Sequence, residues 1–310
     1  MAYHLSRGVT KFLGGSLATA RFFLGVDGGA TRCRARLRDS SGRELGHSVG
    51  PAANIYIDFD AAMRVVRETI NSVIAAGASK QEIAVGLGIA GFSEDKEAER
   101  VAAALPDFAR IVVVNDAVAA CVGANGLGDG GLVIAGTGSA GIARVGATTT
   151  IIGGRGFQLG DDGSAARLGE TALRATLRAL DGLEPMSELA RALGRHFGGD
   201  PLRMTRWAAE AKPRDYGAFA PQILELATSG DTRAREIAGD AARAIAALAN
   251  ALNALGAERI ALVGGLGEPL RPYLSPDVAR RLVRPRRDAV DGAILLAGGT
   301  LDEAEGSPCT

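Results

Sequence analysis

The first 124 residues contain short apolar runs that are separated by glycine and by polar or charged residues. Residues 22–26 show no alternation of polar and apolar side chains, which is typical of a buried strand. Residues 32–37 alternate basic with small or apolar residues, which predicts a second strand that pairs with the first in a hairpin. Further strands are predicted at 44–49, 83–90 and 111–114. One helix is capped by Asp58 or Asp60 and runs to about Ala76, a second starts at Ser93, and a third, at 117–124, is capped by Asp116. The predicted order of elements is therefore β-β-β-α-β-α-β, with the last helix following the last strand.

The same order of elements restarts after residues 125–131, a glycine-rich segment that marks a boundary between two lobes. Strand, glycine-rich tip, strand and strand follow one another in both halves, which indicates an internal duplication. We therefore predict an α/β fold with a cleft between an N-terminal lobe at 22–124, completed by a closing helix at 288–300, and a C-terminal lobe at 125–287. The second half has strands at 132–135, 140–145, 148–152 and 260–263, and helices at 164–180, in several segments up to 255, and at 290–297.

Residues 1–21 precede the first core strand and combine basic residues with a short apolar run. Ala18-Thr19-Ala20 is similar to a signal-peptide cleavage site, but the apolar part is interrupted by two glycines and a serine. We interpret this segment as a loosely held N-terminal extension that folding and activity do not require.

Composition narrows the class of protein. The 310 residues carry 35 basic and 35 acidic side chains, which argues against nucleic acid or an anionic membrane as the main partner. No apolar run is long enough to cross a bilayer. Cys33, Cys121 and Cys309 fit neither a zinc spacing nor a disulfide framework, so we expect a reducing, cytoplasmic location.

Candidate chemistry lies at the tip of the first hairpin. Asp27 is expected to start the turn, and Gly28 and Gly29 to let it close at backbone angles that other residues avoid. Such a tip can aim backbone N–H groups and the Thr31 hydroxyl at a phosphate, with Asp27 holding Mg²⁺ through water. The same residues also describe an ordinary tight hairpin, so this stretch alone does not decide between the two.

Four segments resemble, in order, the nucleotide-binding elements of the sugar kinase, Hsp70 and actin superfamily. They are residues 27–31 for the first phosphate element, 115–116 for the connecting element, 135–139 for the second phosphate element and 263–265 for the adenosine element. The chain is most similar to the branch of BadF/BadG/BcrA/BcrD ATPases, and it resembles bacterial glucosamine and N-acetylglucosamine kinases at 31–36, 53–55, 153–157, 161–164 and 213–223. The resemblance covers residues 22–299 and implies a duplicated ribonuclease H-like (actin-like ATPase) fold, with ATP in the cleft between two lobes.

The resemblance implies a role for each matching residue. Asp116 would be the general base that accepts the proton of the sugar 6-hydroxyl, although the residues alone describe a helix N-cap equally well. ATP and Mg²⁺ would be the cofactors, an amino sugar the substrate, and a homodimer the expected assembly. The implied phosphate-binding residues are Gly28, Gly29, Thr31, Gly136, Thr137, Gly138 and Ser139; Gly264 and Gly265 would lie against adenine; Asn54, Asp116, Gly154, Arg155, Gly156 and Asp161 would bind the sugar, with Asp162 as the alternative to Asp161; and Asp27 would hold Mg²⁺.

Several functions remain open at this point. We favour glucosamine as the substrate over N-acetylglucosamine, and N-acetylmuramic acid is a further possibility within the branch. An ATP-driven activator of a 2-hydroxyacyl-CoA dehydratase would need two cysteines from each of two subunits to bridge a cluster. Cys121 has no plausible partner for that role. An Hsp70-like or actin-like scaffold needs large subdomain insertions, for which this chain has no room.

Overall fold

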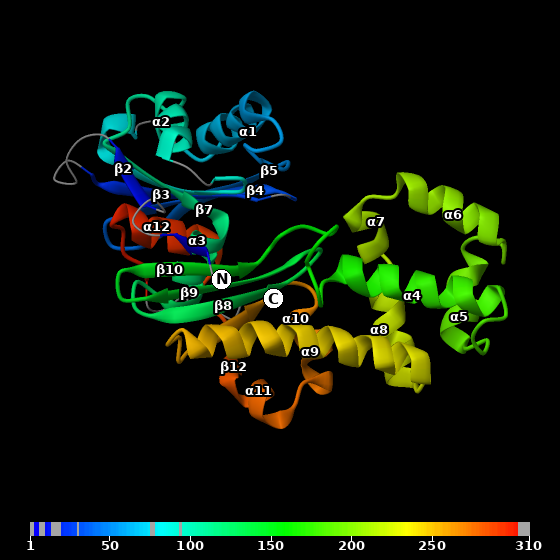
Figure 1. Cartoon of the computed structure of the whole chain (residues 1–310). Coiled ribbons are helices and arrows are strands. Elements are labelled where there is room, and N and C mark those ends of the chain that lie inside the picture. Colours follow the sequence, from blue (N-terminus) through cyan, green and yellow to red (C-terminus); the bar gives the residue numbers. More distant parts are fainter. Residues whose placement is uncertain are drawn as a thin grey trace.

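A computed structural model describes residues 3–5, 10–13, 20–29, 31–74, 78–92 and 95–302. Its layers run from helices through a sheet, a central pair of helices and a second sheet to a long outer helix (Figure 1). The N-terminal sheet has the strand order β2 (Thr10–Leu13), β7 (Arg110–Asn115), β6 (Ile83–Ile89), β3 (Phe22–Gly28), β4 (Cys33–Asp39) and β5 (Glu44–Gly50). The C-terminal sheet has the order β1 (Tyr3–Leu5), β10 (Thr148–Gly153), β9 (Ser139–Val145), β8 (Gly130–Ala135), β11 (Ile260–Val263) and β12 (Leu282–Val283).

The predicted duplication is confirmed by strand pairing. In the first sheet β3 pairs antiparallel with β4 and parallel with β6, and in the second β8 pairs antiparallel with β9 and parallel with β11. The outer pairs β4–β5 and β9–β10 are antiparallel in both sheets, and β6–β7 and β11–β12 are parallel. The α/β fold class is therefore as predicted, and each half places its glycine-rich tip at the same end of its first strand.

The N-terminal segment adds a strand to each sheet. β1 pairs antiparallel with β10, and β2 pairs antiparallel with β7. Both are edge positions, on opposite edges of the duplicated topology. The backbone of residues 3–5 and 10–13 thus lies on the sheets, whereas we expected residues 1–21 to be loosely held.

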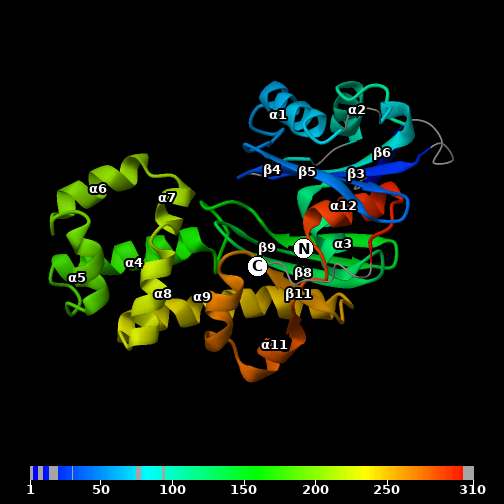
Figure 2. The same ribbon diagram turned by 180° about the vertical axis from the view of Figure 1, so that it is seen from behind.

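Helices cover both sheets and extend to one side. Figures 1 and 2 show α1 (Phe59–Asn71) and α2 (Asp95–Ala103) on the outer face of the N-terminal sheet, α9 (Thr232–Ala254) along the C-terminal sheet, and a group of helices beyond the ends of its strands. α1 ends earlier than the expected Ala76, and the expected cap Ser93 lies outside the described residues. The remaining helices are α4 (Ala165–Leu180), α5 (Glu188–Arg195), α6 (Pro201–Glu210), α7 (Pro213–Gly217), α8 (Ala220–Ser229), α10 (Gly267–Leu270) and α11 (Pro276–Arg281), with short 3-10 turns η2 (Lys80–Glu82) and η3 (Arg271–Tyr273).

The two lobes meet at a pair of closely packed helices, α3 (Asp116–Asn125) and α12 (Ala289–Ala297). A Cβ atom added at Gly123 of α3 would lie 1.9 Å from the Asp288 carbonyl oxygen, and one at Gly86 of β6 would lie 1.9 Å from the Ala293 carbonyl oxygen. Only glycine permits backbones to approach this closely. The chain therefore returns at its C-terminal end to the N-terminal sheet, although the exact lobe boundaries remain a prediction. In the described part of the chain, no helix combines the length and hydrophobicity needed to cross a membrane.

Candidate active site

The first glycine-rich tip follows β3 and is closed by a main-chain hydrogen bond. The Gly29 N–H donates to the Arg32 carbonyl oxygen at 3.0 Å, and Thr31 is exposed. The expectation that Asp27 starts the turn is wrong, because β3 continues to Gly28 and pairs with β4 and β6 over its whole length. Strand pairing on both sides therefore fixes the backbone of Asp27 more firmly than a turn would.

The Asp27 carboxylate has one oxygen occupied and one directed at the tip. Oδ2 accepts hydrogen bonds from Arg34, opposite in β4, at 2.7 and 3.2 Å. A Cβ atom added at Gly29 would lie 3.8 Å from Oδ1. Burial raises the pKa of Asp27, and the hydrogen bond and charge of Arg34 oppose that rise. Arg34 also pairs with Asp288 at 3.4 Å, which connects the tip to the start of α12.

Asp116 begins α3 at the carboxyl end of β7. The prediction that it caps this helix is wrong, because Asn115 is the N-cap and accepts from the Ala117 N–H at 3.0 Å. Asp116 is the first helical residue, and its Oδ1 also receives the Ala117 N–H, at 2.9 Å. Burial, followed by the charge of Asp27, raises the pKa of Asp116 from 3.8 to about 6. A carboxyl group with such a pKa is ionised at pH 7 and suited to accept a proton.

The second tip is held by main-chain hydrogen bonds. The Gly136 N–H donates to the Gly138 carbonyl oxygen at 3.0 Å, and the Ala165 N–H, at the start of α4, donates to the Gly136 carbonyl oxygen at 2.8 Å. Thr137 is exposed, whereas Ser139 is buried and its hydroxyl donates to the Asp162 carbonyl oxygen at 2.7 Å. The Ser139 hydroxyl therefore donates its hydrogen within the protein, and Thr137 is the solvent-exposed side chain of this tip.

The adenosine element touches the second tip directly. Gly264 has a φ of +99°, and a Cβ atom there would lie 2.3 Å from the Ala135 carbonyl oxygen, so this position requires glycine. Gly264 and Gly265 line a cavity of about 590 Å³ that also receives Arg32 from the N-terminal lobe. The sequence singled out residues 263–265 but not the other residues that line this cavity, because the local sequence does not show which side chains face a common space; they are Leu262, Gly267, Glu268, Pro269, Arg284 and Pro285.

The loop between β10 and α4 carries most of the residues predicted to bind the sugar. Gly154 and Gly156 have φ values of +63° and +82°, which explains why glycine flanks the exposed Arg155. The Gly154 N–H donates to the Ser139 carbonyl oxygen at 3.0 Å. This loop, residues 153–162 and called the sugar loop below, is therefore joined to the second phosphate tip.

Asp161 and Asp162 have different environments. Asp161 is one of two described residues other than glycine with a positive φ, +59°. Burial raises the pKa of Asp161, and hydrogen bonds from the backbone of Ser139 and Gly156 oppose that rise. The Asp162 side chain is 79% exposed and faces Arg167 at 3.8 Å. Asp161 is thus the better held carboxylate, within the sugar loop and next to the second tip.

Asn54 lies beside the first tip. It forms a parallel bridge with Ala90 just beyond β6, and its Oδ1 accepts from the Tyr56 N–H at 3.0 Å. The Ala90 N–H in turn donates to the Gly28 carbonyl oxygen at 2.8 Å. The proposed sugar residues are therefore divided between the lobes, with Asn54 and Asp116 on one and the sugar loop on the other.

The donor chemistry near Asp27 fits a magnesium ion. Asp27 and Asp116 are close enough for the charge of Asp27 to raise the pKa of Asp116. Mg²⁺ is usually bound by one or two carboxylates, water and substrate phosphates rather than by a full protein cage. Within the described residues no cluster of three or more histidine, cysteine or acidic side chains suits a metal.

Several proteins similar to this chain are named as amino-sugar kinases. Glucosamine kinase GspK of Vibrio cholerae is 38% identical over 283 residues, which cover 89% of this chain and 96% of the relative. N-acetyl-D-glucosamine kinase of Dictyostelium discoideum is 31% identical over 74% of this chain and 78% of its own. A crystal structure from Chromobacterium violaceum, provisionally assigned as an N-acetylglucosamine kinase, superposes with a TM-score of 0.83 at 34% identity and covers 90% of this chain and 99% of the other.

The family model described as the BadF/BadG/BcrA/BcrD ATPase family matches residues 24–297, which contain both glycine-rich tips, Asp116, the sugar loop and the closing helix. The duplicated strand order and the paired tips are what the resemblance in the sequence implied. The chain belongs to the BadF/BadG/BcrA/BcrD ATPase family.

Proposed function

We propose that this protein is an ATP-dependent amino-sugar kinase that phosphorylates the 6-hydroxyl of glucosamine. Asp116 is the observation that carries the proposal. It is a half-buried carboxylate with a pKa raised to about 6, directly after a core strand and electrostatically coupled to Asp27 of the first phosphate tip. Phosphoryl transfer needs such a base beside a phosphate-binding cleft.

In the reaction, the sugar 6-hydroxyl oxygen forms a bond to the γ-phosphorus of ATP, and the bond between that phosphorus and the β,γ-bridging oxygen breaks. The hydroxyl proton passes to Asp116, and ADP leaves with the bridging oxygen. The tips supply backbone N–H groups, Thr31 and Thr137 to the phosphates, and Gly264 and Gly265 line the cavity for adenosine. Asp27 would hold Mg²⁺, which neutralises charge on the phosphate oxygens when bound.

The choice of glucosamine depends on charge at carbon 2. A free amine is protonated near neutral pH and forms a charge-assisted hydrogen bond with a carboxylate, whereas an acetylated amine cannot. The similarity to a glucosamine kinase over 89% of the chain favours the first sugar, and the similarity to an N-acetyl-D-glucosamine kinase supports the second as the alternative. A buried carboxylate left without its partner costs about 2 kcal/mol, enough for at least about tenfold discrimination.

The test is ADP release with a panel of sugars at saturating ATP and Mg²⁺. We expect kcat/KM to be at least about tenfold higher for glucosamine than for N-acetylglucosamine. A higher kcat/KM for N-acetylglucosamine would reject glucosamine as the preferred substrate but would still support the assignment as an amino-sugar kinase. ADP release that no amino sugar stimulates would reject the kinase itself.

A dehydratase activator is a weaker alternative for this member of the family. Cys33 and Cys121 are free and fully buried, at 0% and 1% exposure. Burial raises the pKa of both thiols to about 11, so neither is the exposed thiolate that a cluster shared between subunits needs. Cys309 lies outside the described residues.

Two further properties belong to this proposal. A cytoplasmic location fits free thiols and the use of ATP. A homodimer is proposed from the resemblance to amino-sugar kinases. Sedimentation equilibrium would measure the assembly directly, and a monomer at all concentrations would reject the dimer.

A further inference from the structure

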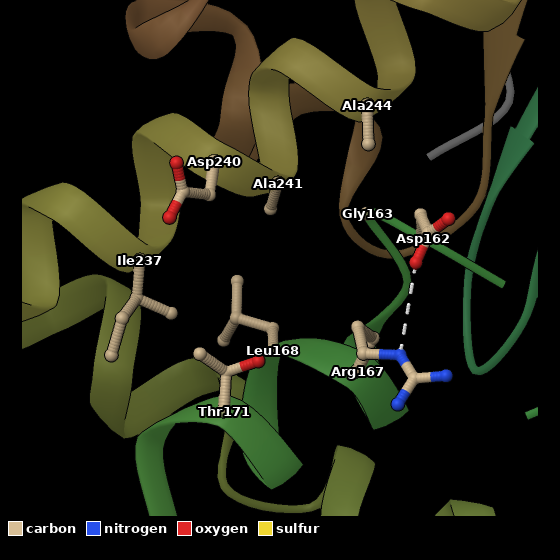
Figure 3. A pocket seen from close by; sticks show the side chains of 9 residues that line it. All are labelled: Asp162, Gly163, Arg167, Leu168, Thr171, Ile237, Asp240, Ala241 and Ala244. Atoms are coloured by element: carbon tan, nitrogen blue, oxygen red, sulfur yellow. Dashed lines mark ion pairs between the residues drawn. The ribbon is translucent and has the colours of Figure 1, made fainter. Parts of the chain in front are cut away.

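Arg167, in the first turn of α4, reaches back to the sugar loop and contacts it at several points. Its Nη2 donates to the carbonyl oxygens of Phe157 and Gly160, the latter at 3.1 Å. Its guanidinium carbon lies 4.9 Å from the centroid of the Phe157 ring. Its Nε faces the Asp162 carboxylate at 3.8 Å, the ion pair drawn in Figure 3. One side chain thus binds the sugar loop at three positions.

The aromatic ring of Phe157 continues this contact into the helices beside the sheet. Phe157 lies 5.2 Å from the Tyr216 ring, and Tyr216 lies 5.0 Å from the Trp207 ring. α7, which carries Tyr216, packs tightly against α4, because a Cβ atom at Gly169 would lie 2.0 Å from the Tyr216 carbonyl oxygen. Figure 1 shows α7 beside α4. Tyr216, which belongs to the matching segment 213–223, therefore contacts the sugar loop through the Phe157 ring.

The sugar loop needs such support because Asp161 holds a left-handed backbone conformation. A residue with a side chain at φ +59° is strained, and it keeps that conformation only where its surroundings fix it. The carbonyl oxygens that Arg167 binds lie on the N-terminal side of Asp161, at Phe157 and Gly160. Arg167 binds both sites with one planar group, a geometry that lysine cannot reproduce.

We infer that Arg167 is a positioning residue that holds the sugar loop, and with it Asp161, in the conformation that binds the amino sugar. This inference rests on the proposed function. Arg167 acts through the backbone of Phe157 and Gly160 rather than by touching substrate. Loss of Arg167 should therefore weaken the binding of the sugar. ATP binding should stay nearly unchanged, because the second tip has its own main-chain hydrogen bonds to α4.

Arg174 offers a matched control on the same helix. Arg167 and Arg174 both pair with Glu170, at 3.4 and 3.0 Å. The Arg174 side chain is 76% exposed, against 28% for Arg167, and it pairs with Glu170 rather than with the sugar loop. Arg174→Met thus removes the same charge and one ion pair to Glu170, and it spares the loop.

The first experiment measures the loop without using activity. Trypsin cleaves after arginine, and the exposed Arg155 lies within the sugar loop. Mass spectrometry measures the rate of cleavage between Arg155 and Gly156. We expect this rate to be about tenfold higher in Arg167→Met than in the wild type, because local opening of the loop becomes easier. Cleavage at other arginines, and in Arg174→Met, should keep the wild-type rate. Equal acceleration at all sites, or none at Arg155, would overturn the inference.

The second experiment measures kinetics with glucosamine and ATP. Arg167→Met should raise KM for the sugar about tenfold or more and change KM for ATP less than about twofold, and Arg167→Lys should recover part of the loss. If Arg167→Met does not fold, Arg167→Lys alone decides by the same two measurements. Wild-type values in a folded variant would reject the positioning role. Absence of any amino-sugar kinase activity in the wild type would reject the proposed function instead, and the cleavage rates would still test the loop contact.

Discussion

The two glycine-rich tips occupy equivalent places in the duplicated fold, yet they are held in different ways. Charged side chains hold the first tip, where Arg34 binds Asp27 and Asp288. The second is held by main-chain hydrogen bonds to α4 and by the loop after β11, where the Leu266 N–H donates to the Ala135 carbonyl oxygen at 2.9 Å. The first tip thus has ionic contacts in addition to its main-chain hydrogen bonds, whereas the second tip is held mainly by contacts of the backbone. Substitutions that remove charge should damage the first tip most, and those that add a Cβ atom at a tip should damage the second.

The largest effect is expected from Asp116→Asn. Loss of the general base should lower kcat by about 10² or more. The fold should remain, because Asn115 caps α3, and a neutral amide removes a half-buried charge whose pKa is raised. The melting temperature at pH 7 should therefore equal or exceed that of the wild type. Turnover close to the wild-type value would remove Asp116 from the mechanism.

Gly138→Ala should have the next largest effect, on the C-terminal lobe. The added Cβ atom would lie 2.9 Å from Asp161 Oδ2, so the carboxylate must move. We expect KM to rise about tenfold for the sugar, and also for ATP, because one residue touches both sites. Gly128→Ala is the control, since no atom lies within 4 Å of its Cβ position. Unchanged KM for the sugar would separate Asp161 from sugar binding.

The pH dependence should report the charges of the N-terminal lobe. The base works only when ionised, and the pKa of Asp116 is raised to about 6. With both substrates below saturation, the rate should therefore fall about tenfold per pH unit as the pH decreases below 6. An ordinary aspartate would keep full activity to about pH 4. A rate that stays level down to pH 4.5 would contradict the raised pKa.

Gly265→Ala should have a moderate effect confined to ATP. No atom lies within 4 Å of its Cβ position, so the fold should not change, whereas the new methyl group would enter the cavity proposed for adenosine. We expect KM for ATP to rise about fivefold to tenfold, with KM for the sugar unchanged. Gly264→Ala should differ by lowering the melting temperature, because it meets the Ala135 carbonyl oxygen. An unchanged KM for ATP would place adenine elsewhere.

The smallest effect is expected from deletion of residues 1–20, which changes the two lobes in the same way. The deletion removes one edge strand from each sheet and leaves the strands that carry the site. We expect kcat/KM within about twofold of the full chain and a melting temperature lower by only a few degrees. Circular dichroism and ADP release measure both. A deleted chain that does not fold would show that β1 and β2 are essential.

The sequence by itself determined the order of elements, the duplication and the two tips. Apolar runs of strand length and the glycines that end them are local features, and they placed β3, β8 and β11 to within a few residues. Motifs in a fixed order also identified Asp116 as a candidate, although the neighbouring Asn115 turned out to be the cap. The N-cap is the last residue with non-helical backbone angles before the helix. When two adjacent polar residues can both cap, as Asn115 and Asp116 can, the sequence does not show which of them has those angles.

Only the tertiary structure decided which distant residues meet. The pairing of Arg34 with Asp288 joins positions 254 residues apart. Arg167 and Tyr216, from two different helices, both contact the sugar loop. The pKa of Asp116 likewise depends on burial and on Asp27, which belongs to another strand. Such effects follow from distances across the fold, and distances between separate elements are set by packing rather than by the local sequence.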